Sequence, residues 1–349
     1  MPNSWEATGI TIGPLQLTGR ALLAPMAGVT DAGMRTVAAT HGASLTFSEM
    51  VAAAGFAHGD EQARARARLP NGGLAGVQLA GCDPVALAEA ARLVEGEGAA
   101  LIDINMGCPA KRVTGGLAGS ALMRDLDHAV RLVVAVVGAV RVPVTLKMRL
   151  GWDATSLNAS QLAARAEQAG VALVTVHGRT RAQFYTGTAD WRAVASVKRA
   201  LRHIPLVVNG DCHSAADAAA MLQQSGADGV MIGRAAMGRP WLVGQVAASL
   251  RTGSAAPAPS ARERLTSAAS HLESLLTQLG VEKGLRHARK HLAAYVEHAG
   301  PASSRRSETR RRIVSTDKPR EAAWLLREAF LDCEADPSVD PAHLVEAAA

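Results

Sequence analysis

The chain has 349 residues, enough for one large domain and a smaller one, and no apolar run approaches the roughly 20 residues of a membrane-spanning helix. With 48% hydrophobic and 19% charged residues, the composition excludes a largely disordered chain. Residues 261–331 carry 14 Lys and Arg against 8 Asp and Glu, so the net charge of +6 lies entirely in this segment.

Short apolar runs alternate with Ala-rich stretches between Ala21 and Leu250. The runs with the length of buried parallel strands are residues 21–26, 45–50, 75–80, 101–106, 143–148, 172–177, 205–210 and 228–233. The stretches between them predict helices at 30–41, 84–97, 125–139, 157–169, 190–201, 214–225 and 235–250, with Thr30, Asp83 and Ser214 as N-caps. Residues 51–73 are irregular and partly basic, so the helix prediction is weakest there. Eight such units favour a (β/α)8 TIM barrel, an α/β fold, with a doubly wound open sheet as the alternative.

A small all-helical domain is predicted after the barrel. Residues 251–260 are rich in small residues and Pro and are typical of a linker. Beyond them, the helical spacing places Leu285, Ala288, Leu292, Tyr295 and Val296 on one apolar face. We therefore expect a barrel over 1–250, a basic helical domain over 261–331 and a frayed tail over 332–349.

Polar side chains stand at the ends of the predicted strands, where the catalytic residues of a barrel lie. They are Glu49, Gln78, Asn105, Cys108, Lys147, Arg149, His177, Asn209, Asp211 and Arg234, together with the segment Pro25, Met26 and Ala27. So many polar groups at corresponding positions are hard to explain by packing alone, and they predict one converging site. The last two strands end in the Gly-rich turns NGDC (209–212) and IGRAAMGRP (232–240), which are typical of phosphate binding through backbone N–H groups of Gly210 and Gly233. For Lys147, a structural ion pair is the alternative to a ligand contact.

The four cysteines contain no CxxC pair and no His partner at metal-ligand spacing, which indicates free thiols, a cytoplasmic protein and no metal. Cys108 follows a predicted strand on a Gly-Pro turn that would expose its side chain, so a catalytic role is favoured over packing. Cys82 and Cys212 are interpreted as structural, and Cys333 lies outside the barrel with no expected role.

The motifs in this order resemble bacterial tRNA-dihydrouridine synthases, most closely the B-type branch that is also named for a nitrogen-regulation locus. The resemblance covers roughly residues 10–330. It rests on LAPMAGVTD (23–31), DINMGCPAKRVTGGLAGSALMRD (103–125), TLKMRLGWD (145–153), VHGRTRAQFYTGTADW (176–191), VVNGD (207–211) and GADGVMIGRAAMGRPW (226–241). The block around Cys108 and the HGRTR segment are its most specific parts.

The resemblance implies an FMN cofactor and NADPH as the reductant. Pro25, Met26 and Ala27 would pass along the flavin ring, and Gln78 and Lys147 would bind its polar edge. Asn209, Gly210, Asp211, Gly233 and Arg234 would hold the ribityl chain and phosphate, with Asn105 and His177 near the ring and substrate. Cys108 matches the general acid of the family. Hydride would reach carbon 6 of uracil and Cys108 would protonate carbon 5, which agrees with the fact that ordinary thiols are mostly protonated near pH 7. Arg149 and Arg179 could stabilise the enolate or grip a phosphate.

The expected partner is tRNA, whose stacked uracil must be turned out to reach a barrel mouth. The basic helical segment would supply phosphate contacts through Lys283, Arg286, Arg289 and Lys290 and through the arginines at 305, 306 and 310–312. We expect a monomer that acts without a membrane. Two segments, 31–43 with its small residues and the Arg-rich 59–70, depart from the family pattern and could alter which uridine is reduced.

Two other functions fit parts of the sequence. One is an FMN barrel oxidoreductase that acts on a free pyrimidine, against which the basic helical segment argues. The other is a tRNA-binding chaperone, which would not need Cys108, Lys147 and the phosphate turns. A different flavin-dependent RNA modification also stays open.

Overall fold

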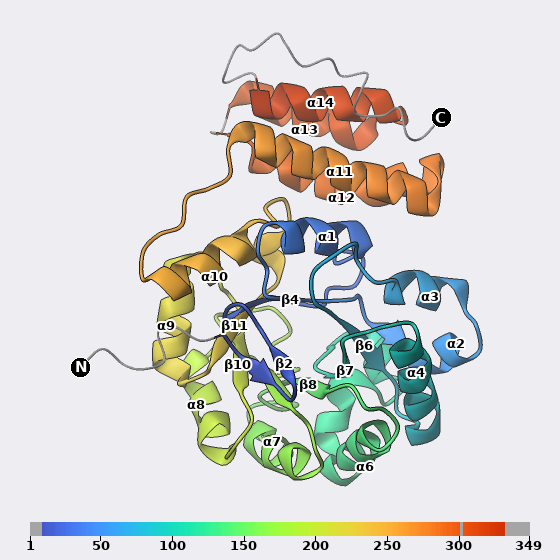
Figure 1. The fold of residues 1–349 in the computed structure, drawn as a ribbon, viewed down its shortest axis with the longest axis vertical. Coiled ribbons are helices and arrows are strands. Elements are labelled where there is room, and N and C mark those ends of the chain that lie inside the picture. Colours follow the sequence, from blue (N-terminus) through green and yellow to red (C-terminus); the bar gives the residue numbers. More distant parts are fainter. Residues whose placement is uncertain (1–8, 301–302, 332–349) are drawn as a thin grey trace.

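Eight parallel strands close into a barrel in the computed structural model, which describes residues 9–300 and 303–331 (Figure 1). They are β3 (Ala21–Leu23), β4 (Leu45–Phe47), β6 (Ala75–Ala80), β7 (Leu101–Met106), β8 (Val144–Arg149), β9 (Leu173–His177), β10 (Leu206–Asn209) and β11 (Gly229–Ile232). Hydrogen bonds run from β4 through β3, β11, β10, β9, β8 and β7 to β6, and β4 pairs with β6 to close the ring. The short strand β5 (Val51–Ala52) adds to β6 beyond β4.

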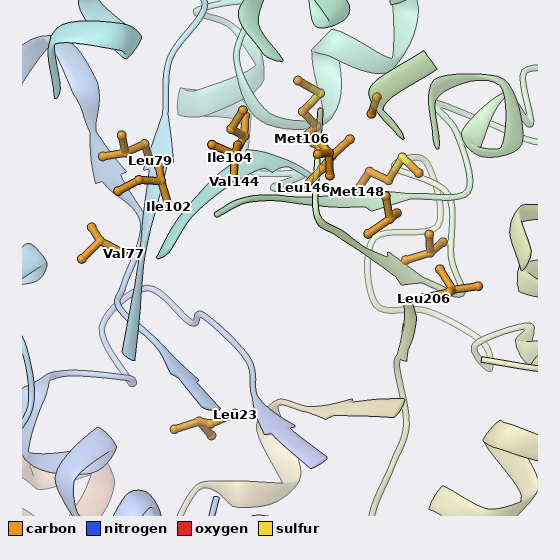
Figure 2. Close-up of a cluster of buried hydrophobic side chains, with 14 of the residues drawn as sticks. Leu23, Val77, Leu79, Ile102, Ile104, Met106, Val144, Leu146, Met148 and Leu206 are labelled. Atoms are coloured by element: carbon orange, nitrogen blue, oxygen red, sulfur yellow. The ribbon is translucent and has the colours of Figure 1, made fainter. Parts of the chain in front are cut away.

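Helices surround the barrel and bury the outer face of its strands. They are α1 (Ala32–Thr40), α2 (Ala53–Ala57), α3 (Glu61–Ala67), α4 (Pro84–Gly96), α6 (Leu126–Val137), α7 (Ala159–Gln168), α8 (Trp191–Ala200), α9 (Ala215–Ser225) and α10 (Leu242–Thr252), with the short turns α5 (Lys111–Thr114), η1 (Gly119–Arg124) and η2 (Arg234–Ala236). Strand residues such as Val77, Ile102 and Leu146 share one apolar core with these helices (Figure 2). This burial of both faces explains why the strands read as continuous apolar runs in the sequence.

A second core fills the barrel at the beginning of its strands. It contains Leu101, Leu173 and Val207 from alternating strand positions, and Ile12 and Leu17 from the region of the hairpin formed by β1 (Thr11–Ile12) and β2 (Leu15–Gln16). The hairpin therefore covers the amino ends of the strands and leaves the carboxyl ends for ligand binding.

Four further helices form a separate layer beside α1, at the top of Figure 1: α11 (Ala261–Leu279), α12 (Val281–Glu297), α13 (Ser304–Ser315) and α14 (Pro319–Leu331). A capping box at Ser260 and Glu263 starts α11, and Gly280 in the left-handed region separates it from α12. The five residues predicted to form the apolar face of α12 are all buried in the core that these helices share with Trp241. None of the helices in residues 9–300 and 303–331 is long and apolar enough to cross a membrane.

The barrel and its helical extension confirm the fold predicted from sequence, and the open-sheet alternative is wrong. Asp83 and Ser214 cap α4 and α9 as predicted. The predicted N-cap Thr30 is wrong, because its hydroxyl accepts the Met26 N–H and the next residue, Asp31, accepts the N–H of Met34 instead.

Two helix predictions also need correction. The irregular segment 51–73 contains α2 and α3. The helix predicted from residue 235 begins at Leu242, after η2 and Pro240. Cys333 and the predicted tail lie outside the described residues.

Candidate active site

A cavity of about 430 Å³ opens at the carboxyl ends of the barrel strands. Its walls contain Pro25, Met26, Ala27, Gln78, Asn105, Cys108, Lys147, Arg149, His177, Asn209, Gly210, Asp211, Gly233 and Arg234. The structure thus brings together the residues that the strand ends predict, apart from Glu49, which is buried and is not part of the lining. Arg179, predicted as a substrate contact, is also buried outside the lining. The volume falls within the range of small-molecule and cofactor sites.

Two amides in the cavity wall are connected to a carboxylate buried behind them. Gln78 donates from Nε2 to Asp103 (2.7 Å) and accepts at Oε1 from Asn105 Nδ2 (2.7 Å), while Thr145 donates to the other oxygen of Asp103 (2.6 Å). Burial raises the pKa of Asp103 to about 6, against the opposing hydrogen bonds from Thr145 and Gln78. These hydrogen bonds fix the direction of the Gln78 and Asn105 amides, which is the arrangement a site needs to recognise a polar ring edge.

Lys147 enters the cavity from the end of β8. Its ammonium donates to Asn209 Oδ1 at 3.2 Å, and Asn209 Nδ2 in turn donates to the Met231 carbonyl at 2.8 Å. Burial and then the charge of Arg149 lower the pKa of Lys147 to about 8, so the side chain is mostly charged at neutral pH. An ammonium has three donors, and the remaining ones are available to an anionic ligand.

Cys108 lies on the loop that follows β7 and lines the cavity. Oδ1 of Asn105 accepts the backbone N–H groups of Gly107 (3.1 Å) and Cys108 (3.0 Å), and Ser120 donates to the Cys108 carbonyl from both its N–H and its hydroxyl. These bonds fix the backbone on both sides of the thiol. Gly119, at φ +60°, passes so close that a Cβ there would lie 2.8 Å from the Cys108 carbonyl oxygen.

The turn after β10 is held by an ion pair. Arg179 donates to both oxygens of Asp211, at 2.6 and 3.0 Å, and also to the carbonyls of Thr186 and Gly187. Burial alone would raise the pKa of Asp211, but the bonds from Arg179 and Ala189 hold this pKa below its ordinary value. Asp211 adopts φ +57°, a conformation that is uncommon for a residue with a side chain. Arg179 and Asp211 thus shape the turn. The sequence predicted that Arg179 contacts the substrate, but its guanidinium is bound to the protein itself.

Arg149 is also largely committed to the protein. Its guanidinium donates to the carbonyls of Gly107, Thr180 and Phe184, each at 2.8 Å. By contrast, the side chain of Arg234 is 58% exposed and reaches Asp211 only at 3.5 Å. Arg234 is therefore the cation of the phosphate-type turn that is most free to meet a ligand.

His177 lies between these cations with 8% of its surface exposed. Burial, followed by the charges of Lys147, Arg149 and Arg179, lowers the pKa of His177 well below its ordinary value. The imidazole ring is therefore neutral at pH 7. It can form a hydrogen bond with a ligand, but it does not attract an anion by charge.

Two aromatic residues at the cavity mouth were missed by the sequence reasoning. Phe184 and Tyr185 line the cavity and are 38% and 48% exposed. The Tyr185 ring lies 4.8 Å from the Arg234 guanidinium and 5.5 Å from that of Arg149. The available signal in the sequence was a pair of adjacent aromatic residues in a chain with only 3% aromatic residues.

The cations of the helical layer fall into two groups. Lys283, Arg286, Arg289 and Lys290 of α12 form no ion pair with an acidic side chain among the described residues. On α13, Arg305, Arg310, Arg311 and Arg312 pair with Glu328, Glu297, Glu308 and Glu321, and Arg306 donates to backbone carbonyls. The α13 arginines predicted as phosphate contacts are thus partly neutralised, and α12 carries the less compensated charge.

Comparisons with known proteins identify a family by sequence and the same fold by structure. A model of the dihydrouridine synthase (Dus) family matches residues 22–333. The probable tRNA-dihydrouridine synthase of Rhodobacter capsulatus is 51% identical over 328 residues, which are 93% of this chain and 99% of that protein. The tRNA-dihydrouridine synthase B of Xanthomonas axonopodis pv. citri is 47% identical, over 82% of this chain and 86% of its own. The solved structure of histamine dehydrogenase from Rhizobium sp. 4-9 shares the fold, with a TM-score of 0.50 and 15% identity over 77% of this chain and 50% of that one.

Proposed function

Because the chain belongs to the dihydrouridine synthase family, we propose that this enzyme reduces the 5,6-double bond of particular uridines in cytoplasmic tRNA, with FMN in the barrel cavity and NADPH as the reductant. The observation that carries the proposal is the placement of the Cys108 thiol, the Lys147 ammonium and the Gly233–Arg234 turn in the walls of one cavity. A thiol, a cation and a phosphate-type turn are the three features that such a reaction needs together.

The donor set of the cavity fits a flavin. Pro25, Met26 and Ala27 offer an apolar wall for a planar ring, and the oriented amide of Gln78 with the Lys147 ammonium suits a ring edge that gains negative charge on reduction. At the opposite end, backbone N–H groups near Gly233 and the exposed Arg234 suit a phosphate. Lys147 would stabilise negative charge on the ring edge, and Arg234 would neutralise the phosphate.

Bound flavin would supply the hydride that adds to carbon 6 of the uracil. The protein then has to deliver one proton to carbon 5, and Cys108 is the residue in the cavity wall that we assign to this step. Asn105 holds the thiol in place, since its Oδ1 binds the backbone on the amino side of Cys108. His177 and Asn105 would orient the uracil carbonyl groups through hydrogen bonds. One hydride and one proton together account for the two-electron reduction.

The substrate base must leave its stack before it can enter the cavity, which costs a few kcal/mol. The exposed ring of Tyr185, flanked by Arg149 and Arg234, would offer the displaced base a stacking surface. The cationic side of α12 reaches the same rim, because Lys290 Nζ comes within 3.3 Å of where a Cβ of Gly28 would lie, in the loop that carries Met26 and Ala27. Phosphate contacts along α12 can therefore offset the cost of unstacking.

The test is dihydrouridine mapping in tRNA from cells that lack the gene and are complemented with wild type, Cys108→Ala or Cys82→Ala. Cys82 is the matched control, since it is a partly exposed thiol that does not belong to the cavity walls described here. We expect specific dihydrouridines to disappear on deletion and to return with wild type and Cys82→Ala but not with Cys108→Ala. An unchanged map in the deletion strain, with no other synthase covering the same sites, would remove uridine reduction as the activity.

A further inference from the structure

Four polar side chains that the proposed reaction does not use meet where the barrel contacts the helical layer. Asp31, the N-cap of α1, faces His271 of α11 and two histidines of α12, His287 and His291. Asp31, His271 and His291 are buried, and His287 is 27% exposed at its side chain. A concentration of three imidazoles around one buried carboxylate calls for an explanation beyond helix capping.

The nitrogen and oxygen atoms of this cluster converge on one oxygen of Asp31. Oδ2 lies 3.3 Å from His291 Nε2 and 3.9 Å from His287 Nε2. The potential ligand atoms of these three residues all lie within 4.8 Å of one another. Since His287 and His291 are four residues apart on a helix, their rings project from the same face, which is a common way to place two imidazoles on one metal ion.

His291 has no hydrogen-bond partner at either ring nitrogen, although 1% of its surface is exposed. A buried imidazole normally satisfies at least one nitrogen, because burying an unpaired polar group costs about 1–3 kcal/mol. Nε2 of His291 lies 3.3 Å from Asp31 Oδ2 without the alignment of a hydrogen bond. An ion bound between His291 Nε2 and Asp31 Oδ2 would give both atoms a partner.

We propose that Asp31, His287 and His291 form a binding site for a divalent transition-metal ion, of which Zn²⁺ fits best. Two imidazoles and a carboxylate are typical zinc ligands, whereas Mg²⁺ and Ca²⁺ prefer oxygen. Ligand bonds of about 2.0–2.2 Å in a tetrahedral site separate ligand atoms by roughly 3.4 Å. Asp31 Oδ2 lies 3.3 Å from His291 Nε2 and 3.9 Å from His287 Nε2, so a small shift of His287 would complete the site. The sequence predicted no metal, because only Cys-centred spacings were considered.

His271 completes the site as an outer partner. A carboxylate oxygen can only accept, so His271 Nε2 donates to Asp31 Oδ1 at 3.1 Å and its Nδ1 accepts from the Tyr295 hydroxyl at 3.1 Å. The N–H of Met34 also donates to Oδ1, at 3.0 Å. His271 Nε2 also lies 3.2 Å from Oδ2, so its bond is shared between the two carboxylate oxygens. Together, His271 and the Met34 N–H hold the Asp31 carboxylate facing the two ligand histidines, as outer partners hold a metal-binding carboxylate.

The site has cations as well as ligands around it. Lys290 Nζ lies 3.4 Å from His287 Nε2, and the Arg35 guanidinium donates to the Thr30 carbonyl beside Asp31. Arg35 is fixed, but Lys290 is exposed and can turn toward Glu49, to which it is electrostatically attracted. Lys290 therefore competes with the ion, and its removal should strengthen metal binding. Bound metal would join α12 to the start of α1 and stabilise the contact between the helical layer and the barrel.

The test uses tag-free, full-length protein that has been treated with a chelator and then titrated with ZnCl₂ or CoCl₂. We expect one ion per chain by elemental analysis and a higher melting temperature with the ion than without it. With Co²⁺ we also expect the visible absorption band of a metal site of low symmetry. Loss of an outer partner weakens metal binding by about 10–100-fold, and His287→Ala should weaken it by more because it removes a ligand. Lys290→Met should bind the ion at least as tightly as wild type. His58→Ala, an exposed histidine far from the cluster in sequence, is the control and should bind normally.

His291→Gln is a second ligand variant, and circular dichroism checks that each variant keeps its helical content. Absence of stoichiometric binding by wild type overturns the proposal. Binding that is unchanged in His287→Ala and His291→Gln also overturns it, because the ion would then sit elsewhere. None of these readouts requires tRNA, so the outcome is separate from that of the proposed reaction.

Discussion

Arg179 and Asp211 form a two-pronged ion pair that joins the end of β9 to the turn after β10. The Arg179 side chain is 2% exposed and that of Asp211 is 22% exposed. The guanidinium and the Ala189 N–H hold the carboxylate of Asp211 while its backbone adopts a left-handed conformation. The pair therefore determines the shape of the turn that we assign to the phosphate.

Replacing Arg179 by Met should lower the free energy of unfolding by about 1–3 kcal/mol, because Asp211 and two backbone carbonyls lose their hydrogen-bond partner. Flavin should also be lost more readily during purification. Arg165→Met is the matched control, since the exposed Arg165–Asp127 pair should contribute no more than about 1 kcal/mol. Urea unfolding of both variants measures the difference, and equal losses would contradict a structural role for Arg179.

Asp103 should make the protein less stable as the pH rises. Its pKa is raised to about 6 in the fold, from an ordinary value of about 3.9 in the unfolded chain. Below about pH 4 Asp103 is protonated in both the folded and the unfolded state, so it adds no pH-dependent cost to folding. Above pH 6 both states have lost the proton and the folded state bears the full cost of about 3 kcal/mol. Asp103→Asn should remove this cost, so its stability relative to wild type should increase between about pH 4 and pH 7. A constant difference across this range, measured by denaturant titration, would contradict the raised pKa.

Tyr185→Ala should weaken tRNA binding or raise KM by the equivalent of about 1–3 kcal/mol, the contribution of one stacked base. Tyr185→Phe is the informative comparison, because it keeps the ring near the Arg149 and Arg234 guanidinium groups and removes only the hydroxyl. We expect Phe to behave like wild type in steady-state kinetics with tRNA transcripts. If Phe were as damaging as Ala, the hydroxyl and not the ring face would be the important group.

Binding of tRNA should weaken with salt, and the α12 cations should account for part of the slope. Arg286→Ala should lower the slope of log K against log salt by about one, as expected for one lost phosphate contact. Arg311→Ala on α13 should change the slope less, because Glu308 already pairs with this arginine. Fluorescence anisotropy of labelled tRNA at several salt concentrations measures both, and identical effects would show that α12 has no special part in docking.

The sequence predicts the barrel well, and the polar residues at its strand ends do line one cavity, for a physical reason. Parallel strands buried on both faces are continuous apolar runs, so a polar residue such as Gln78, Lys147 or Asn209 stands out and marks the part of the strand that borders the cavity. The direction of each side chain is not encoded locally. That Arg179 turns back to Asp211 while Arg234 stays exposed depends on strands that lie apart in sequence.

Other features depend on contacts between distant elements. The acids that neutralise the arginines of α13 come partly from α12 and α14, as Glu297 and Glu328 show. The histidines His287 and His291 have ligand spacing, but their third partner, Asp31, comes from the first βα unit of the barrel. Such groupings become visible only when the chain is folded.

The turn from Met26 to Asp31 gives the enzyme a short mechanical linkage. At one end Met26 forms part of the cavity wall, and in the middle Thr30 bonds back to the Met26 backbone. At the other end Asp31 is held by His271 of the helical layer. If α11 and α12 bind RNA and the cavity holds the flavin as proposed, a force on these helices would reach the loop that borders the flavin through Asp31 and Thr30.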